Sequence, residues 1–332
     1  MVFLISRTGS CIMQWQRLHK YMANTLYWSV YKNLEKEVLE LSQWVYIDDR
    51  QLDTYSVKTA DLLMRTAVEI ESLSKALYFK HGGTKPDDND LYFDTDCLKL
   101  LHEKFNIGSK VVLVSDVFQY CVKGENIKLT PLHNSWKNGK CDWKKAYQAV
   151  KHDRYNQLKK GNIKHLLRAL ASLFLLNLYF MDRAYPLSTD LKAVSLDPRM
   201  GSDLFSVKIH TDNINITETS VINKQPDFDE CVYVVQPIMD SITNVRDTLL
   251  RFNSEVNAEK DRLFLNKMNR FVADGTVPSF REYHLVPDEK KQPLMVEAYR
   301  EAFPTIYSRY NDTLRDVYQR VEYEAVLNTN QY

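Results

Sequence analysis

The stretch from Asp142 to Asp182 constrains the fold of this chain more than any other, because it joins a charge-rich helix to a long apolar one. The apolar part, Leu166 to Met181, is shorter than the roughly 20 residues that a membrane span needs, and it contains Arg168. We therefore expect a buried helix rather than a membrane span. The low glycine count, 9 in 332 residues, and the 20 tyrosines favour a compact helical body around it.

The charge-rich part of this stretch places ionisable side chains on a helix that is also expected to pack an apolar face against neighbouring helices. At about 100° per residue, an apolar arc carries Trp143 and Tyr147. Asp153 and Arg154 fall on the same arc, and His152 lies at its margin. Charged groups that face a core are costly unless they are paired. We therefore expect Asp153 and Arg154 to point toward neighbouring helices and to find partners there.

A second helix, which starts near Asp53 or Ser56 and ends at a pair of glycines, supplies a candidate partner. Small residues recur on it every seven positions and let another helix approach closely. These are Ala60, Ala67 and Ser74. Glu71 lies on the same arc. We expect Glu71 to pair with Arg154 or His152, with Glu69 as the alternative partner.

Two interpretations of these groups stay open. In the first, they form a buried network that fixes how two helices pack. In the second, they form a site in which His152 transfers a proton and Glu71 orients its ring. Lys145 and Arg154 then stabilise the charge of a phosphate group.

Lysines near this cluster are candidates for a basic surface beside it. Lys144 and Lys151, seven positions apart, line the helix face opposite the apolar arc. The full set of expected nucleic-acid-binding residues is Lys144, Lys151, Lys159, Lys160 and Lys164. A helix face that is merely solvated is the alternative explanation for them.

The residues described above resemble a known family. A helix with Glu71-Ser72-Leu73-Ser74-Lys75, followed by Trp143, by Ala146 to Arg154 and by a long apolar helix, is similar to the HEPN group (higher-eukaryote and prokaryote nucleotide-binding helical domains). The resemblance covers about residues 15–185. It implies a helical bundle, often dimeric, and many members of the group are metal-independent ribonucleases of toxin or antiviral systems.

One feature of the family pattern is missing. In those ribonucleases an arginine and a histidine four to six residues later meet across a dimer, whereas no histidine of this chain has an arginine at that spacing. The nearest substitutes are lysines: Lys145 six residues before His152, Lys75 five before His81 and Lys128 four before His133, counted as the residues that lie between. Lysine supplies positive charge but not the planar fork that grips a phosphate at two points. The resemblance therefore implies the helical fold better than it implies cleavage.

Other chemistry has little support in the sequence. No His-Glu-x-x-His, Cys-x-x-Cys, Gly-rich phosphate loop or Gly-x-Ser-x-Gly motif occurs, so we predict no metal and no cofactor. The five cysteines lie at least twenty positions apart and fit neither a disulfide framework nor a metal site, which favours a cytoplasmic protein. A net charge of +1 gives no overall attraction to nucleic acid or membranes, so an RNA contact needs a local patch.

The remaining patterns divide the chain in two. Residues 1–186 are predicted as the HEPN-like bundle, with a β-hairpin formed by Lys110 to Ser115 and the residues around Gly124, Glu125 and Asn126. Residues 187–332 are predicted as a small β segment followed by carboxy-terminal helices that pack back on the bundle, the last of them from Met295 to Leu327. We therefore predict a mainly α protein: a helical bundle with a small β-hairpin or sheet insertion and carboxy-terminal helices.

The leading prediction for function is RNA or nucleotide binding in a bacterial stress or antiphage setting. Metal-independent ribonuclease activity is compatible with it but not favoured. The alternative is a non-enzymatic adaptor or assembly protein that binds a protein partner through its tyrosine-rich carboxy-terminal helix, although tyrosines at helical spacing also serve as half-buried packing. That helix contains Tyr299, Tyr307, Tyr310, Tyr318 and Tyr323. No membrane partner is predicted, and a homodimer is left open.

Overall fold

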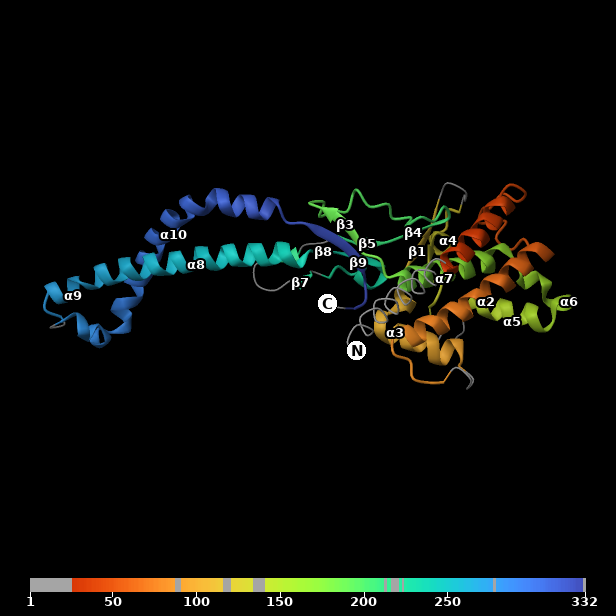
Figure 1. Ribbon diagram of the computed structural model, residues 1–332, viewed down its shortest axis with the longest axis horizontal. Coiled ribbons are helices and arrows are strands. Elements are labelled where there is room, and N and C mark those ends of the chain that lie inside the picture. The colour runs from red at the N-terminus through yellow and green to blue at the C-terminus, as the bar shows by residue number, and fades with distance from the viewer. Residues whose placement is uncertain are drawn as a thin grey trace, which may run out of the picture.

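The computed structural model describes residues 26–86, 91–115, 121–133, 141–211, 214–215, 221–222, 224–276 and 279–330. Figure 1 shows a helical head with small sheets, from which a hairpin of two long helices projects along the long axis of the molecule. We call this hairpin the arm. The predicted class, mainly α with a small β insertion, is confirmed.

The head is built around α7 (Ile163–Met181), which packs against α2 (Val57–Lys80) and α5 (Asp142–His152). A first helix, described over residues 26–41, stacks aromatic rings on α7. By length and composition α7 could cross a membrane, yet 83% of its most apolar window is buried inside the head. It is therefore the buried core helix that the sequence predicts.

α2 and α7 lie side by side, from their capped amino-terminal ends to the point where Lys80 Nζ donates a hydrogen bond to the backbone oxygen of Phe180. Ser56 caps α2 by accepting a hydrogen bond from the backbone N–H of Thr59 at 3.0 Å, and the Thr59 hydroxyl accepts in return from the backbone N–H of Ser56. Asn162 caps α7 through its side-chain oxygen. Gly161, just before this cap, lies so close to Ala60 that an added Cβ would come within 2.6 Å of the alanine Cβ. Ala60, one of the three small residues predicted to allow close approach, is therefore a point of close approach, although to the turn before α7 and not to a helix.

Short helices connect the long ones. A six-residue π-helix, η1, leads directly into α3, and Asp153 separates α5 from α6. The short elements are η1 (Phe93–Leu98), α3 (Lys99–Phe105), the 3₁₀ turn η2 (Ile107–Ser109), α4 (Gly124–Ile127), α6 (Arg154–Gln157), and the 3₁₀ turns η3 (Leu158–Lys160) and η4 (Phe228–Glu230). The charge-rich helix, which is predicted to carry Trp143 and Arg154 on one arc, is therefore broken at Asp153.

Small sheets join the two halves of the chain. The strands are β1 (Val112–Val114), β2 (Lys128–Leu129), β3 (Tyr185–Ser188), β4 (Phe205–Val207), β5 (Ile209–His210), β6 (Ile214–Asn215), β7 (Val221–Ile222), β8 (Tyr233–Pro237) and β9 (Tyr323–Leu327). One antiparallel sheet has the order β2-β1-β4 and contains the strand predicted within Lys110 to Ser115 as β1. The residues around Gly124, predicted as part of the same hairpin, form α4, and the strand that pairs with β1 is β2. A second has the order β3-β9-β8-β5, with β5 parallel to β8, while β6 pairs with β7. Because β4 pairs with β1, the sheets cross the predicted boundary after residue 186, and both halves share one core.

A buried carboxylate fastens the first helix to the loop before β4. Glu35 is 1% exposed and accepts hydrogen bonds from the Tyr31 hydroxyl at 2.7 Å and the Ser202 hydroxyl at 2.5 Å. It also accepts from the backbone N–H groups of Asp203 and Leu204, at 2.9 and 3.1 Å. Burial and the neighbouring Glu35 charge raise the pKa of Tyr31. We call this set of contacts the Glu35 clamp.

The arm consists of α8 (Met239–Met268) and α10 (Asp288–Gln319), which pack against each other. At the tip, α9 (Arg270–Ala273) and the 3₁₀ helix η5 (Phe280–Leu285) connect them. Figure 1 shows α9 at one end of the molecule and α6 at the other. The expectation that the carboxy-terminal helices pack back on the bundle is wrong for most of their length, because their apolar residues pack on each other in clusters along the arm. Only the base of the arm, with Val245 and Val317, joins the core of the head.

The end of the arm also differs from the predicted helix through Leu327. α10 ends at Gln319, and residues 323–327 form β9, which pairs with β8. Alternate residues of β9 are buried, as expected of a strand. Pro293 and Pro304 lie inside α10, where each lacks a backbone hydrogen-bond donor, and the helix bends along its course (Figure 1).

Candidate functional site

A strongly basic segment covers α5, α6, η3 and the start of α7. Residues 143–168 contain eight lysines and arginines against one aspartate, although the whole chain has a net charge of +1. Figure 1 places α6 at the end of the head that faces away from the arm. We call this surface the basic end and define it by Lys145, Lys151, Arg154, Lys159, Lys160 and Lys164.

The lysines of the basic end are not neutralised by acidic neighbours. Four of the five are exposed and Lys164 is half-buried, and none forms an ion pair within the described part of the chain. Arg154 is paired with Asp61 at 2.9 Å, with both side chains 47% exposed. Unpaired cations at this density attract phosphate groups, and nucleic acids release counterions when such cations bind them.

Exposed tyrosines lie among these lysines. Tyr155, next to Arg154 on α6, is 96% exposed. A backbone bridge between Tyr55 and Asn162 brings a second tyrosine, 52% exposed, to the turn that follows Lys160. Exposed rings beside cations are the combination with which proteins stack single-stranded bases while holding the phosphate backbone.

α5 ends at His152 because Asp153 starts the next helix. The Asp153 side chain accepts a hydrogen bond from the backbone N–H of Asn156 at 3.2 Å and so acts as the N-cap of α6. Asp153 and Arg154 are both exposed. The prediction that they lie on a buried arc is therefore wrong, because it assumed one unbroken helix.

The four predicted catalytic groups are not assembled into one site. His152 is exposed, and its Nε2 lies 3.1 Å from Oε1 of Gln148. Lys145 is exposed on the same helix. Arg154 has a different carboxylate partner on α2, and Glu71 lines a pocket instead. The expected pairing of Glu71 with Arg154 or His152 is therefore wrong.

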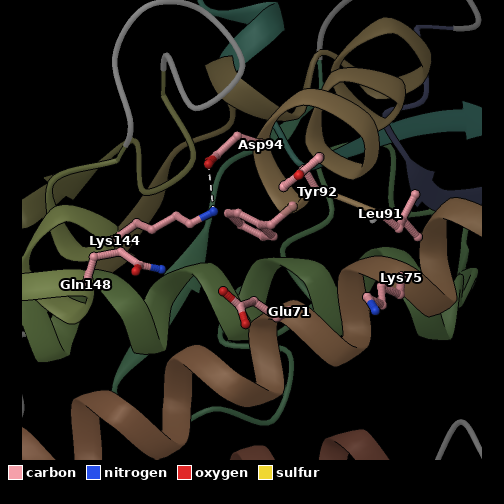
Figure 2. A pocket seen from close by; sticks show the side chains of 8 residues that line it. Glu71, Lys75, Leu91, Tyr92, Asp94, Lys144 and Gln148 are labelled. Atoms are coloured by element: carbon pink, nitrogen blue, oxygen red, sulfur yellow. Dashed lines mark hydrogen bonds and ion pairs between the residues drawn. The ribbon is translucent and has the colours of Figure 1, made fainter. Parts of the chain in front are cut away.

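A polar pocket of about 350 Å³ lies between α2, η1 and α5. Figure 2 shows its lining, which consists of Glu71, Lys75, Leu91, Tyr92, Phe93, Asp94, Lys144 and Gln148. We call it the α2/α5 pocket. The wall that carries Phe93 and Asp94 is the π-helix η1, and such helices are rare and often occur at functional sites.

Lys144 lies in this pocket and not on the surface where the sequence places it. The residue is 6% exposed, and its Nζ donates a hydrogen bond to Oδ2 of Asp94 at 2.6 Å. The same Nζ lies 4.3 Å from the centroid of the Phe93 ring. The prediction that Lys144 belongs to a basic surface with Lys151 is therefore wrong, because η1 covers this face of α5.

Two acceptor groups of this pocket, the Glu71 carboxylate and Oδ1 of Asp94, have no hydrogen-bond partner in the described part of the chain. Figure 2 shows the Glu71 carboxylate pointing into the pocket, and Glu71 makes no hydrogen bond or ion pair with residues in the described ranges. Oδ1 of Asp94 is buried and also has no hydrogen-bond partner there. Lys75 and Lys144 contribute two ammonium groups, so the charges of the lining balance. Because a buried acceptor without a partner is costly, a ligand that brings hydrogen-bond donors would be stabilised here.

Comparisons with known proteins do not assign either region. No protein-family model matches the chain, and no curated protein or solved structure is significantly similar to it. Within the described ranges, no group of three or more histidine, cysteine, aspartate or glutamate side chains is arranged to hold a metal ion. The two candidate regions, the basic end and the α2/α5 pocket, therefore rest on their geometry and charge.

Proposed function

We propose that the protein binds single-stranded RNA through the basic end. The observation that carries this proposal is a group of five lysines without ion-pair partners in the described part of the chain, set beside the exposed rings of Tyr155 and Tyr55. Phosphate contacts of such lysines supply affinity without sequence preference. Tyrosine rings stack on unpaired bases, and RNA is recognised mainly where its bases are unpaired.

Two further considerations support the same class of ligand. The resemblance of residues 15–185 to the HEPN group remains a prediction, and it implies a nucleotide-binding helical bundle. An RNA-binding role in a bacterial stress or antiphage response would place the protein in the cytoplasm. We do not propose ribonuclease activity, because His152 hydrogen-bonds Gln148 at the surface while Glu71 lines the α2/α5 pocket.

Binding of RNA is expected to weaken steeply with salt. For single strands the slope of log K against log salt concentration is about −0.7 per phosphate contact, so four to five contacts give a slope of about −3. The triple substitution Lys151→Gln, Lys159→Gln and Lys160→Gln is expected to make this slope shallower by about two and to weaken binding at least about tenfold at low salt. Fluorescence anisotropy of a labelled twelve-residue oligouridylate measures both quantities.

The matched control removes the same charge elsewhere. Lys99→Gln, Lys192→Gln and Lys290→Gln change three exposed lysines outside the basic end and are expected to leave slope and affinity unchanged. Tyr155→Ala is expected to weaken RNA binding by about 1 kcal/mol, because it removes a stacked ring. It should leave the salt dependence of binding unchanged. Equal losses in the two triple variants would mean that net charge alone attracts the RNA, which would contradict the proposal.

A second function, assembly through the arm, is favoured by an aromatic stripe on α10. Met295, Tyr299, Phe303 and Tyr307 follow one another at four-residue intervals. The ring centroids of Tyr299 and Phe303 are 5.7 Å apart, as are those of Phe303 and Tyr307, and the second pair is stacked. Tyr299 and Tyr307 are 46% and 44% exposed. Contiguous exposed apolar surface on a projecting hairpin marks an interaction surface.

We propose that a second copy of the chain covers this stripe, so that two arms pair. Acidic and basic residues are interspersed along both arm helices, so the arm has no strong field that would repel another arm or attract RNA. Sedimentation equilibrium is expected to give a dimer for the natural chain and a monomer for the double variant Tyr299→Asp, Tyr307→Asp. Tyr155→Asp changes an exposed tyrosine of the head and should leave the dimer intact. A natural chain that is monomeric at every concentration would refute arm pairing.

A further inference from the structure

We propose that the α2/α5 pocket holds one unpaired guanine base of the RNA that the basic end binds, an inference that rests on the proposed function. One helix connects the two regions. α5 contributes Gln148 to the pocket and, one turn later, His152 to the outer surface, and these two side chains are in contact. Lys151 in the same turn belongs to the basic end. A nucleotide whose phosphate contacts this turn can therefore direct its base toward the pocket.

The charge of the pocket suits a neutral base better than a phosphate group. The carboxylates of Glu71 and Asp94 balance the ammonium groups of Lys75 and Lys144. The Lys144 ammonium is already paired with Asp94 and packed on the ring of Phe93. A phosphate that entered the pocket would meet the carboxylate of Glu71, whereas an uncharged ligand with N–H groups would gain charge-assisted hydrogen bonds there.

The hydrogen-bonding groups of the pocket match the Watson–Crick edge of guanine. This edge presents two adjacent donors, the ring N1–H and the exocyclic amino group, which one carboxylate can accept with its two oxygens. The Glu71 carboxylate points into the pocket and has no partner in the described part of the chain (Figure 2). The carbonyl oxygen beside N1 needs a donor, and the amide group of Gln148 and the ammonium of Lys75 line the same pocket.

The other bases complement Glu71 less well. The Watson–Crick edge of adenine places a donor beside an acceptor, so one carboxylate oxygen would face a ring nitrogen lone pair. Uracil places its single N–H between two carbonyl oxygens, which a carboxylate repels. Cytosine has no ring N–H on this edge. A site that recognises the Watson–Crick edge of a base with one carboxylate therefore selects guanine.

The size and rim of the pocket fit one base with its ribose. A volume of about 350 Å³ lies at the small end of the range for small-molecule sites, which is roughly 300–1,000 Å³. Tyr92 at the rim is 59% exposed, and the Nζ of Lys85 lies 5.2 Å from its ring centroid. Asp96 accepts hydrogen bonds from the backbone N–H of Tyr92 and from Lys85, both at 2.8 Å, and so holds the rim in place. The Tyr92 ring is available for stacking with a base that enters the pocket.

Free nucleosides test the pocket without the basic end, because they carry no phosphate. Isothermal titration calorimetry is expected to show guanosine binding at least about tenfold more tightly than adenosine. Glu71→Gln is expected to abolish this preference, because an amide offers one acceptor where the guanine edge needs two. Glu71 has no partner in the described ranges, so this substitution leaves the fold intact. Glu69→Gln, on the same helix but outside the α2/α5 pocket, is the matched control.

Oligoribonucleotides test whether the pocket serves the strand at the basic end. A twelve-residue oligouridylate with one central guanosine is expected to bind at least about tenfold more tightly than the strand with uridine throughout. Glu71→Gln should remove this difference and leave the affinity for the all-uridine strand unchanged. Glu69→Gln should retain the difference.

The outcomes separate this inference from the proposed function. Salt-dependent binding of both strands with equal affinity would overturn the guanine pocket and leave RNA binding standing. Guanosine binding without binding of either strand would support the pocket and overturn the proposed function. Equal binding of adenosine and guanosine, or a guanosine preference that survives Glu71→Gln, would overturn the assignment of Glu71 as the guanine reader.

Discussion

Replacing Glu35 with alanine is expected to lower the free energy of unfolding by roughly 3–5 kcal/mol. Glu35 is 1% exposed and accepts hydrogen bonds from Tyr31, from Ser202 and from two backbone N–H groups. Its removal takes the shared acceptor from these four donors, although the Tyr31 and Ser202 hydroxyls and the Leu204 N–H keep hydrogen bonds with one another. It also removes the ion pair with Lys32, and each buried hydrogen bond that is lost without replacement costs about 1–3 kcal/mol. Urea denaturation followed by circular dichroism measures the change.

Two further variants make the Glu35 experiment specific. Glu40→Ala changes an exposed carboxylate on the same helix and is expected to alter stability by no more than about 0.5 kcal/mol. Glu35→Gln keeps one carbonyl oxygen as an acceptor and should lose less stability than the alanine variant. A Glu35→Ala protein as stable as the natural chain would show that the Glu35 clamp does not hold the first helix.

Replacing Lys110 with methionine is expected to have the opposite effect, a gain of about 3 kcal/mol at pH 7. Lys110 is 0% exposed, and its Nζ has no hydrogen-bond partner within the described ranges. Burial lowers the pKa of this lysine from 10.5 to about 8, although the nearby charge of Asp229 acts in the other direction. Methionine retains an unbranched apolar side chain without the buried charge, so it removes this cost.

The pH dependence of the gain follows from the direction of the pKa shift. Below about pH 8 the lysine is protonated in both the folded and the unfolded chain, so the cost of the buried charge is complete. Between about pH 8 and pH 10.5 the unfolded chain keeps the proton that the folded protein releases, so the stability of the natural protein rises with pH. The gain from Lys110→Met should therefore shrink as the pH approaches 10.5.

Denaturation at two pH values, one neutral and one close to the unfolded pKa, tests this expectation. Lys128→Met, which changes an exposed lysine, is the control and should alter stability by less than about 0.5 kcal/mol at either pH. A gain from Lys110→Met that is the same at both pH values would indicate better packing and not the removal of a charge. No gain at neutral pH would contradict an unpaired buried ammonium.

The fold can be predicted from the sequence where local signals decide it. Ser56 marks the start of α2, and the long apolar run from Leu166 to Met181 marks α7 as the core, so neither requires knowledge of the rest of the chain. The projection of the arm cannot be predicted in this way, because apolar positions on α8 and α10 show that each helix packs without showing against what. β9 cannot be predicted for a related reason. The alternation of buried and partly exposed residues along its five positions arises only where it pairs with β8.

The candidate site can be predicted only in part from the sequence. Its lysines lie close together in one segment of the chain, whereas the residues of its pocket come from segments far apart. The charge density of residues 143–168 is evident, and Lys151, Lys159 and Lys160 are exposed as predicted. The position of Lys144 is misjudged because a single buried arc is assigned to α5, whereas η1 covers a second face. No local pattern indicates that Asp94, fifty positions away, meets this lysine.

The connection between arm and head has a consequence for how the molecule can vary. α8 follows β8 and α10 precedes β9, and these strands pair directly, with Pro237 opposite Tyr323 where the arm leaves the sheet. The arm therefore leaves the sheet and returns to it at the same point, the pair of strands β8 and β9. Adding or removing seven residues in each helix would move the tip by about 10 Å and leave every strand pair intact. The hairpin is thus a spacer whose reach can change in evolution or by design independently of the ligand-binding head.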